Sequence, residues 1–217
     1  MKEYELIAFD LDGTLTDPSH GLILGFEYAF KKLGIDYGTR DSLYRFIGPP
    51  LFEAWKSEFS LTDEESDRAV LLFREYYNVY GWWDNTIYPG VEDMLKALRS
   101  KGKKIVLATS KPEDTAKKVL KLFGIDKYFD FIGGAATHKV RDKKHEVLEY
   151  SLNSVGFTDK RRAILVGDRI FDAEGARIVG IDSMGVLWGH STPEEVSASG
   201  FTLIAKDTEE ATRLLLG

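Results

Sequence analysis

The sequence predicts an α/β fold: a doubly wound, Rossmann-like parallel sheet with an inserted α-helical domain. Short apolar runs that end in glycine turns alternate with amphipathic helical segments, which is the pattern of right-handed βαβ units. The first run, residues 6–9, is apolar on both faces, as expected of a strand buried inside a parallel sheet. Between residues 17 and 83 the pattern is helical and contains no buried strand.

We therefore expect two domains. Residues 1–16 and 84–217 should form the α/β core, and residues 17–83 should form a small helical bundle joined to it by two hinges. An all-helical block of this kind cannot belong to the parallel sheet, so it is an insertion between the first and second strands.

The insertion carries clear helix signals. Its first helix has apolar residues at three- and four-residue steps and should end at Gly34. A capping box formed by Thr62 and Glu65 should open its last helix. We expect one apolar stripe on that helix, made of Val70, Phe73, Tyr77 and Tyr80.

The remainder of the chain repeats the alternation of strand and helix. Each expected strand is apolar, and each is followed by a helical segment, as in a doubly wound sheet. The further strands are expected at residues 104–109, 129–132, 163–166, 183–187 and 202–205.

Composition excludes several classes of function. The net charge of -6 provides no basic surface for a nucleic-acid polymer, although a local cation could still attract a small anionic substrate. The chain has no cysteine, which excludes disulfides, thiolate nucleophiles and cysteine zinc sites. No apolar stretch approaches membrane-spanning length, and the first residues lack the pattern of a secretory signal. We expect a cytoplasmic protein with no membrane partner; the oligomeric state is not predicted.

Two carboxylates follow the first strand. Asp10 and Asp12 are two residues apart, so in an extended chain both point to the same side. The crevice at the carboxyl ends of parallel strands is where ligands bind in open α/β sheets. Carboxylates this close repel each other unless a cation is near, and an oxygen-lined site suits Mg²⁺. The alternatives are a plain turn around Gly13 or a weak Ca²⁺ site.

A hydroxyl pair ends the second strand. Thr109 and Ser110, with free N–H groups at the start of the next helix, could bind a phosphate oxygen. Ser110 and Glu113 could instead form a capping box that needs no ligand. Both arrangements can hold together, with Ser110 capping and Thr109 binding.

A lysine, either Lys143 or Lys144, stands at the expected start of a helix. Lysine at a helix start opposes the helix dipole, so nearby aspartates or a phosphate should offset it. Helical phase favours Lys144 over Lys143, because Val147 and Leu148 would then be its inward neighbours. The alternative is a pair of solvated lysines.

A second pair of carboxylates follows the fourth strand. Gly167 and Asp168 come directly after its apolar run, and Asp172 lies four residues further on. A Gly-Asp pair alone often marks only a turn with a helix cap. Several aspartates in one crevice would, however, leave uncompensated charge without a metal ion.

Together these residues resemble the motifs of the haloacid dehalogenase superfamily. Asp-Leu-Asp-Gly-Thr-Leu at residues 10–15 resembles its first motif, Thr109 its second, Lys144 its third and Gly167 to Asp172 its fourth, in the expected order. The resemblance implies a Mg²⁺-dependent phosphatase that acts through an aspartyl phosphate. The insertion after the first motif resembles the C1 type of cap, a lid that sets substrate choice.

The resemblance also implies roles for individual residues. Asp10 would be the nucleophile and Asp12 the proton shuttle, with Mg²⁺ held by Asp10, the main-chain carbonyl of Asp12, and Asp168. Thr109 and Lys144 would supply a positive electrostatic field that stabilises the phosphate, and Asp172 would orient Lys144 or a metal-bound water. Further phosphate contacts are expected from Leu11, Gly13, Thr14 and Ser110.

Shorter strings resemble the phosphoglycolate phosphatase and 5′-nucleotidase-like branch. These are Gly-Pro-Pro-Leu at residues 48–51, Thr-Ser-Lys-Pro at residues 109–112 and Gly-Val-Leu-Trp-Gly at residues 185–189. The implied substrate is a small phosphomonoester, either a nucleoside 5′-monophosphate or a phosphoglycolate-like molecule. Arg45 and Arg141 could hold its far end, or could be ordinary exposed arginines.

Two other functions remain open at this level. A sugar phosphomutase of the β-phosphoglucomutase type would need an aspartyl phosphate that outlives attack by water. A non-catalytic phosphate-binding module would have no need of a complete set of catalytic residues.

Overall fold

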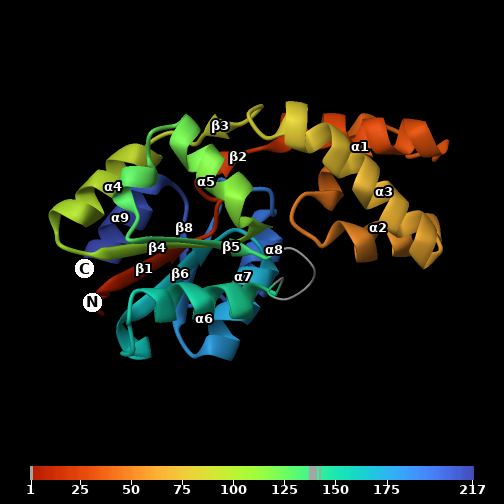
Figure 1. Ribbon diagram of the computed structural model, residues 1–217. Helices are drawn as coiled ribbons and strands as arrows, with labels where there is room; N and C mark the ends of the chain where they lie inside the picture. The colour runs from red at the N-terminus through yellow and green to blue at the C-terminus, as the bar shows by residue number, and fades with distance from the viewer. Residues whose placement is uncertain (1, 137–140, 142) are drawn as a thin grey trace. The chain divides into compact units, whose positions relative to one another are not determined.

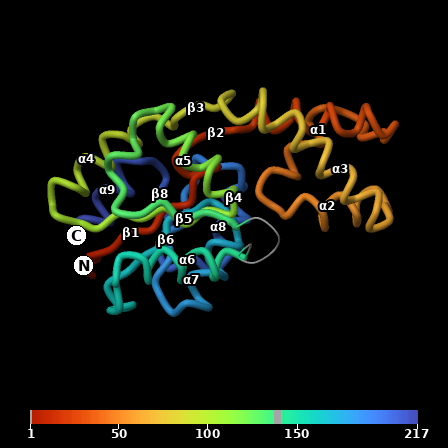
Figure 2. Tube along the Cα trace, viewed as in Figure 1, coloured from red at the N-terminus to blue at the C-terminus, as the bar shows by residue number. Residues whose placement is uncertain are grey.

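A computed structural model describes residues 2–136, 141 and 143–217 of the chain (Figure 1). It contains two compact units. One comprises Met1–Thr16 and Ile87–Gly217, and the other comprises Asp17–Thr86. Figure 2 follows the chain as it passes from the first unit into the second and back again.

The first unit is built on a six-stranded sheet. Its strands have the order β5-β4-β1-β6-β7-β8, and all the recorded pairs of neighbouring strands are parallel. The expected doubly wound α/β fold is therefore confirmed. The strands are β1 (Leu6–Phe9), β4 (Lys104–Pro112), β5 (Phe131–Ala135), β6 (Ala163–Gly167), β7 (Asp182–Val186) and β8 (Leu203–Ala205).

Helices cover both faces of this sheet (Figure 1). Helices α4, α5 and α9 lie on one face, and α6 and α7 pack together on the other. None of the helices in the described part of the chain has the length and apolar character of a membrane span. The helices of this unit are α4 (Val91–Ser100), α5 (Glu113–Leu122), α6 (Lys144–Ser154), α7 (Ile170–Val179), α8 (Pro193–Ala198) and α9 (Thr208–Leu216).

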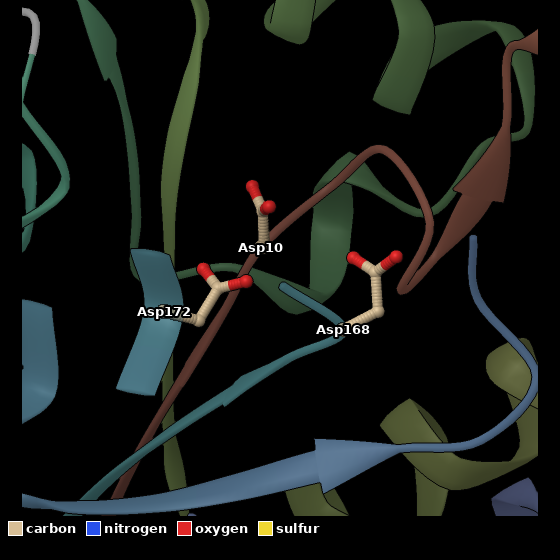
Figure 3. A group of neighbouring side chains, drawn as sticks. All are labelled: Asp10, Asp168 and Asp172. Atoms are coloured by element: carbon tan, nitrogen blue, oxygen red, sulfur yellow. The ribbon is translucent and has the colours of Figure 1, made fainter. Parts of the chain in front are cut away.

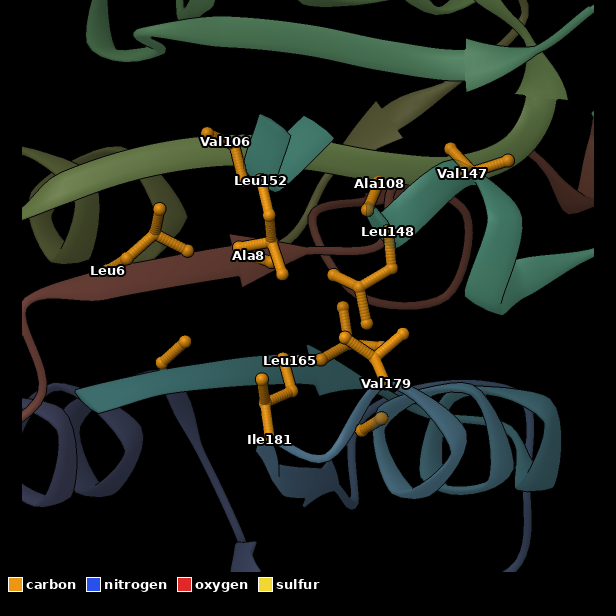
Figure 4. Packing of buried hydrophobic residues seen from close by; sticks show 12 residues of the cluster. Leu6, Ala8, Val106, Ala108, Val147, Leu148, Leu152, Leu165, Val179 and Ile181 are labelled. Carbon is orange, nitrogen blue, oxygen red and sulfur yellow. The ribbon is translucent and has the colours of Figure 1, made fainter. Parts of the chain in front are cut away.

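The core beneath α6 and α7 follows from the alternation of side chains along β1. Leu6 and Ala8 are fully buried and belong to one cluster with Val106 and Leu165 of the neighbouring strands (Figure 4). Leu148 of α6 packs into the same cluster. Burying a leucine side chain of this kind stabilises the fold by about 1.5–3 kcal/mol. This layer holds the ends of β1, β4 and β6 in a fixed relation.

Strand β4 is longer than expected. It continues past Thr109 to Pro112, which pairs with Ala135 of β5 after a shift of register that begins at Ala108. Helix α5 then starts directly after Pro112. The capping box expected at Ser110 is therefore wrong, because Ser110 lies inside the strand and its side chain is exposed.

The second unit is mainly helical. The first helix ends at Gly34 in the left-handed conformation, and the Thr62–Glu65 capping box is present, as predicted. Its elements are α1 (Ser19–Leu33), the 3-10 helix η1 (Arg40–Phe46), α2 (Leu51–Phe59), α3 (Asp63–Tyr76) and the π-helix η2 (Tyr77–Gly81). The short strands β2 (Thr16–Asp17) and β3 (Thr86–Ile87) make a two-stranded sheet.

An aromatic cluster forms the core of the helical unit. The Trp55 ring is fully buried and meets Phe26 edge-on, with 5.4 Å between ring centroids. Phe73 and Tyr77 are buried as expected, but Tyr80 is 59% exposed, so the predicted stripe is wrong at its last position. A π-helix has more residues per turn than an α-helix, and η2 therefore rotates Tyr80 off the buried face.

Candidate active site

The candidate site lies where two central strands end. Asp10 comes directly after β1, which lies between β4 and β6, and Asp168 comes directly after β6. Parallel strands end at the same edge of a sheet. Because the chain continues from β1 to β4 on one side and later to β6 on the other, this is a topological switch point. The local fold therefore brings together residues that are far apart in the sequence.

Three buried carboxylates form one group there. Asp10, Asp168 and Asp172 each have a carboxylate oxygen within 4.8 Å of the corresponding oxygens of the other two (Figure 3). Asp172 joins the group from the first turn of α7. Lys144, at the start of α6, contacts two of them: its Nζ lies 2.9 Å from Asp10 Oδ1 and 2.8 Å from Asp172 Oδ1. The same Nζ donates a hydrogen bond to the carbonyl of Ala108 at 3.1 Å.

The formal charges of this group do not cancel. Three carboxylates and one ammonium leave two negative charges in a buried place. Burial, reinforced by the charge of Asp10, raises the pKa of Asp168 to about 7, although an N–H from His190 opposes the shift. Burial also raises the pKa of Asp172, against the attraction of Lys144. For Lys144, burial alone lowers the pKa, but attraction by Asp10 and Asp172 outweighs it and the net shift is upward.

The group fits a divalent cation. Asp168 Oδ2 accepts the His190 N–H at 2.8 Å, whereas its buried Oδ1 has no hydrogen-bond partner among the described residues. Two uncompensated charges and carboxylate oxygens are the chemistry that Mg²⁺ prefers. Gly13 allows the close approach: it has a φ of 81°, and a Cβ there would lie 2.4 Å from Asp168 Oδ2.

Asp12 has a partner that sequence reasoning missed. Its Oδ2 lies 2.7 Å from Nζ of Lys111, whose side chain is 4% exposed. Asp12 is thus outside the group of three carboxylates that surround the candidate cation site. The Thr-Ser-Lys-Pro string that contains Lys111 could have pointed to this residue. Because the strand was expected to end at Thr109, however, no direction for the Lys111 side chain could be read from the sequence.

The amides of the loop after β1 are mostly occupied. The N–H of Gly13 donates to the carbonyl of Thr16, and that of Thr14 donates to the carbonyl of Leu11. The N–H of Leu11 donates to Asp10 Oδ1 at 2.8 Å. The N–H groups of Gly13 and Thr14 therefore close the turn in this structure, and a phosphate contact from either residue stays a prediction. The Leu11 amide instead holds the carboxylate of Asp10.

The amino-acid sequence is similar to those of known proteins. The family model described as haloacid dehalogenase-like hydrolase matches residues 7–186. The chain belongs to this family. Its relatives include a 5′-nucleotidase from Pseudomonas aeruginosa, 34% identical over 90% of this chain and 88% of that one. The tyrosine-protein kinase PtkA of Mycobacterium tuberculosis is 34% identical over 92% of this chain and 68% of its own length. A phosphoglycolate phosphatase from Aquifex aeolicus is 30% identical over 85% of both.

Solved structures agree with the family assignment. A haloacid dehalogenase-like hydrolase from Streptococcus pneumoniae has a TM-score of 0.90 and 30% identity, covering 99% of each chain. The sequence motifs, the parallel sheet and the names of these relatives together identify a haloacid dehalogenase-like phosphatase. The resemblance stated from the motifs is thus confirmed.

Three further residues predicted to bind phosphate or substrate differ in burial and in their contacts. Thr109 is 2% exposed, and its Oγ1 accepts the N–H of Lys111 at 3.2 Å. Arg141 is held by its own unit: its Nε donates to the Gly134 carbonyl, and its guanidinium carbon lies 3.6 Å from the centroid of the Tyr150 ring. Arg45 belongs to the helical unit, where it pairs with Glu58 at 2.7 Å and is about half exposed.

Proposed function

We propose that this phosphatase uses Mg²⁺ to hydrolyse a small phosphomonoester through an aspartyl-phosphate intermediate. The supporting observation is the buried group of Asp10, Asp168 and Asp172 around Lys144, which carries two uncompensated negative charges. Such a group is costly to bury unless a cation completes it. A purely phosphate-binding module would have no need of it.

Asp10 is the nucleophile in this proposal. One of its carboxylate oxygens attacks phosphorus, and the bond between phosphorus and the leaving oxygen breaks, which divides one difficult step into two. Lys144 and the Leu11 N–H both contact Asp10 Oδ1 and so fix the plane of the carboxylate. Asp12 gives a proton to the leaving oxygen and later takes one from the attacking water.

The cation would be held by the carboxylates of Asp10 and Asp168 and by the main-chain carbonyl of Asp12. When bound, Mg²⁺ neutralises phosphate oxygens so that an anionic nucleophile can approach them. Asp172 is already committed to Lys144 and, through its Oδ2, to the N–H of Arg169. Its role is therefore to orient Lys144.

Substrate choice is assigned to the helical unit, acting as a lid that excludes water. The names of the relatives favour a nucleoside 5′-monophosphate or a phosphoglycolate-like ester as the substrate. A sugar phosphomutase is the alternative outcome of the same test, since it would interconvert sugar phosphates without releasing free phosphate.

The test is a panel of phosphate esters, assayed for phosphate release with Mg²⁺ and with EDTA. The panel contains 4-nitrophenyl phosphate, nucleoside 5′-monophosphates, phosphoglycolate and glucose 1-phosphate. We expect Mg²⁺-dependent release, and Asp10→Asn should lower it by roughly 10³-fold or more while the far-UV spectrum stays unchanged. An Asp10→Asn protein that keeps most of its rate would refute the nucleophile, and isomerisation of glucose 1-phosphate without phosphate release would favour the mutase.

A further inference from the structure

We infer that Lys111 is a positioning residue for the proton transfer made by Asp12, an inference that rests on the proposed function. The two side chains meet inside the α/β unit. Lys111 Nζ lies 2.7 Å from Asp12 Oδ2, and the lysine side chain is 4% exposed against 22% for the aspartate. An ammonium group this deeply buried needs such a partner.

The backbone around Lys111 is constrained from both sides. Its N–H donates to Thr109 Oγ1 at 3.2 Å. On the other side Gly134 passes so close that a Cβ there would lie 2.7 Å from the Lys111 carbonyl oxygen. The register shift between Ala108 and Pro112 sets the direction of the side chain, as bulges near active sites often do.

This rigid lysine acts on a carboxylate that is otherwise poorly held. Asp12 follows a strand and precedes Gly13, and the terminal torsion of an aspartate side chain has a broad preference. Lys111 anchors Oδ2, whereas the buried Oδ1 has no hydrogen-bond partner among the described residues. The anchored carboxylate therefore keeps one defined oxygen for proton transfer.

The alignment of Asp12 matters in the steps of the reaction that move a proton. As the Asp10 oxygen bonds to phosphorus and the leaving oxygen departs, a proton passes from Asp12 to that leaving oxygen. The carboxylate that results lies against the Lys111 ammonium. In the second step water attacks phosphorus, the bond to Asp10 breaks, and the water proton returns to Asp12. A misaligned Asp12 slows protonation of the leaving group most strongly for esters whose leaving alkoxide needs the proton.

The test compares leaving groups in Lys111→Met, Lys111→Arg and, as a matched control, Lys121→Met, which alters an exposed lysine of α5. The substrates are 4-nitrophenyl phosphate, whose leaving anion needs no proton, and the best alkyl ester of the panel above. We expect Lys111→Met to lower kcat/KM about 30-fold or more for the alkyl ester but no more than about 3-fold for 4-nitrophenyl phosphate. Lys111→Arg should recover most of the loss, and Lys121→Met should match the wild type.

A double-mutant cycle with Asp12→Asn isolates the pathway of the effect. If Lys111 acts through Asp12, adding Lys111→Met to Asp12→Asn changes the alkyl-ester rate by less than about 2-fold.

Three results would each overturn the inference, because Lys111 would then bind phosphate or act elsewhere. They are equal losses of rate on both esters, weaker inhibition of Lys111→Met by inorganic phosphate, and additive losses in the double mutant. A wild-type protein that hydrolyses only 4-nitrophenyl phosphate would also overturn it. A wild type that hydrolyses neither ester with Mg²⁺ would overturn the proposed function and this inference with it.

Discussion

Lys144 and Asp172 form an ion pair of 2.8 Å in which the side chains are only 5% and 1% exposed. The pair joins the start of α6 to the first turn of α7, and the same ammonium also contacts Asp10. Three elements of the fold are thus tied together by one charge. The residue that the proposed chemistry requires also neutralises part of the buried acidic group.

The first prediction concerns removal of that charge. Lys144→Met leaves the carboxylates of Asp10 and Asp172 buried without their partner, and breaking a buried pair from one side costs about 3–5 kcal/mol. We expect unfolding by urea to show a loss of this order in the metal-free protein. Phosphatase activity should fall by at least about 100-fold, because the preorganised positive field is gone.

Lys143→Met is the matched control for this prediction. Lys143 precedes α6, and its side chain is exposed, so its removal should leave activity within about 2-fold and stability within about 0.5 kcal/mol. If the two variants behaved in the opposite way, Lys143 would be the active-site lysine.

The second prediction concerns pH and metal removal. The pKa of Asp168 in the fold is about 7, above its ordinary value of 3.8. A carboxyl group with a raised pKa binds its proton more tightly when folded, so its contribution is complete below pH 4 and is lost as the pH rises to 7. The metal-free protein should therefore lose stability on the order of 2–3 kcal/mol between pH 5 and pH 8.

Urea denaturation in EDTA at several pH values tests this slope. Mg²⁺ should stabilise the protein more at pH 8 than at pH 5, because a cation competes with the proton for the same carboxylate. Asp168→Asn should reduce the pH dependence, of which Asp172 contributes the remainder, and should remove most of the Mg²⁺ effect. An unchanged slope in Asp168→Asn would show that another group is responsible.

Much of this site was predictable because its signals are local. The apolar runs fix where strands end, and the carboxylates at those ends therefore predicted the convergence of Asp10 and Asp168. Helical phase alone selected Lys144 over Lys143 as the inward residue, and the structure places its ammonium between two carboxylates.

What could not be predicted depends on contacts between distant segments. The extension of β4 to Pro112 requires hydrogen bonds with β5, so neither the exposure of Ser110 nor the inward direction of Lys111 can be read from one strand. The turn after β1 uses the N–H groups of Gly13 and Thr14, which no composition rule reveals. Arg141 was predicted to be either a substrate ligand or an ordinary exposed arginine, and its contacts with Gly134 and Tyr150 could not be read from the sequence.

The third prediction concerns a close contact in α7. Gly175 lies in the middle of the helix, where alanine would ordinarily stabilise by about 1 kcal/mol. A Cβ at this position would, however, lie 2.6 Å from Cγ of Lys144 and 3.0 Å from its Cβ. We expect Gly175→Ala to displace the lysine, lower the melting temperature and reduce kcat by about 10-fold.

Gly25→Ala in α1 is the control for Gly175→Ala. Its Cβ would meet the ring of Phe73 at 2.8 Å, so it should also destabilise, but in the helical unit and away from Lys144. The stability of each variant, measured without and with Mg²⁺, distinguishes the two. Only Gly175→Ala should alter the gain in stability that Mg²⁺ produces. Equal effects on kcat after correction for the folded fraction would show that the Lys144 contact is not the cause.

The fourth prediction separates two adjacent hydroxyls of β4. Thr109 is buried and its Oγ1 accepts the Lys111 N–H, whereas Ser110 is exposed on the opposite face of the strand. Thr109→Val keeps the shape but removes the hydroxyl that accepts the buried Lys111 N–H, at a cost of about 1–3 kcal/mol. It also releases the backbone that aims Lys111, so both stability and kcat/KM should fall.

Ser110→Ala is the control. It removes a hydroxyl from an exposed position and should change stability by less than about 0.5 kcal/mol. Thermal denaturation and kcat/KM for an alkyl ester, measured for both variants, decide between them. A larger loss of activity in Ser110→Ala than in Thr109→Val would instead favour Ser110 as the phosphate ligand of this strand.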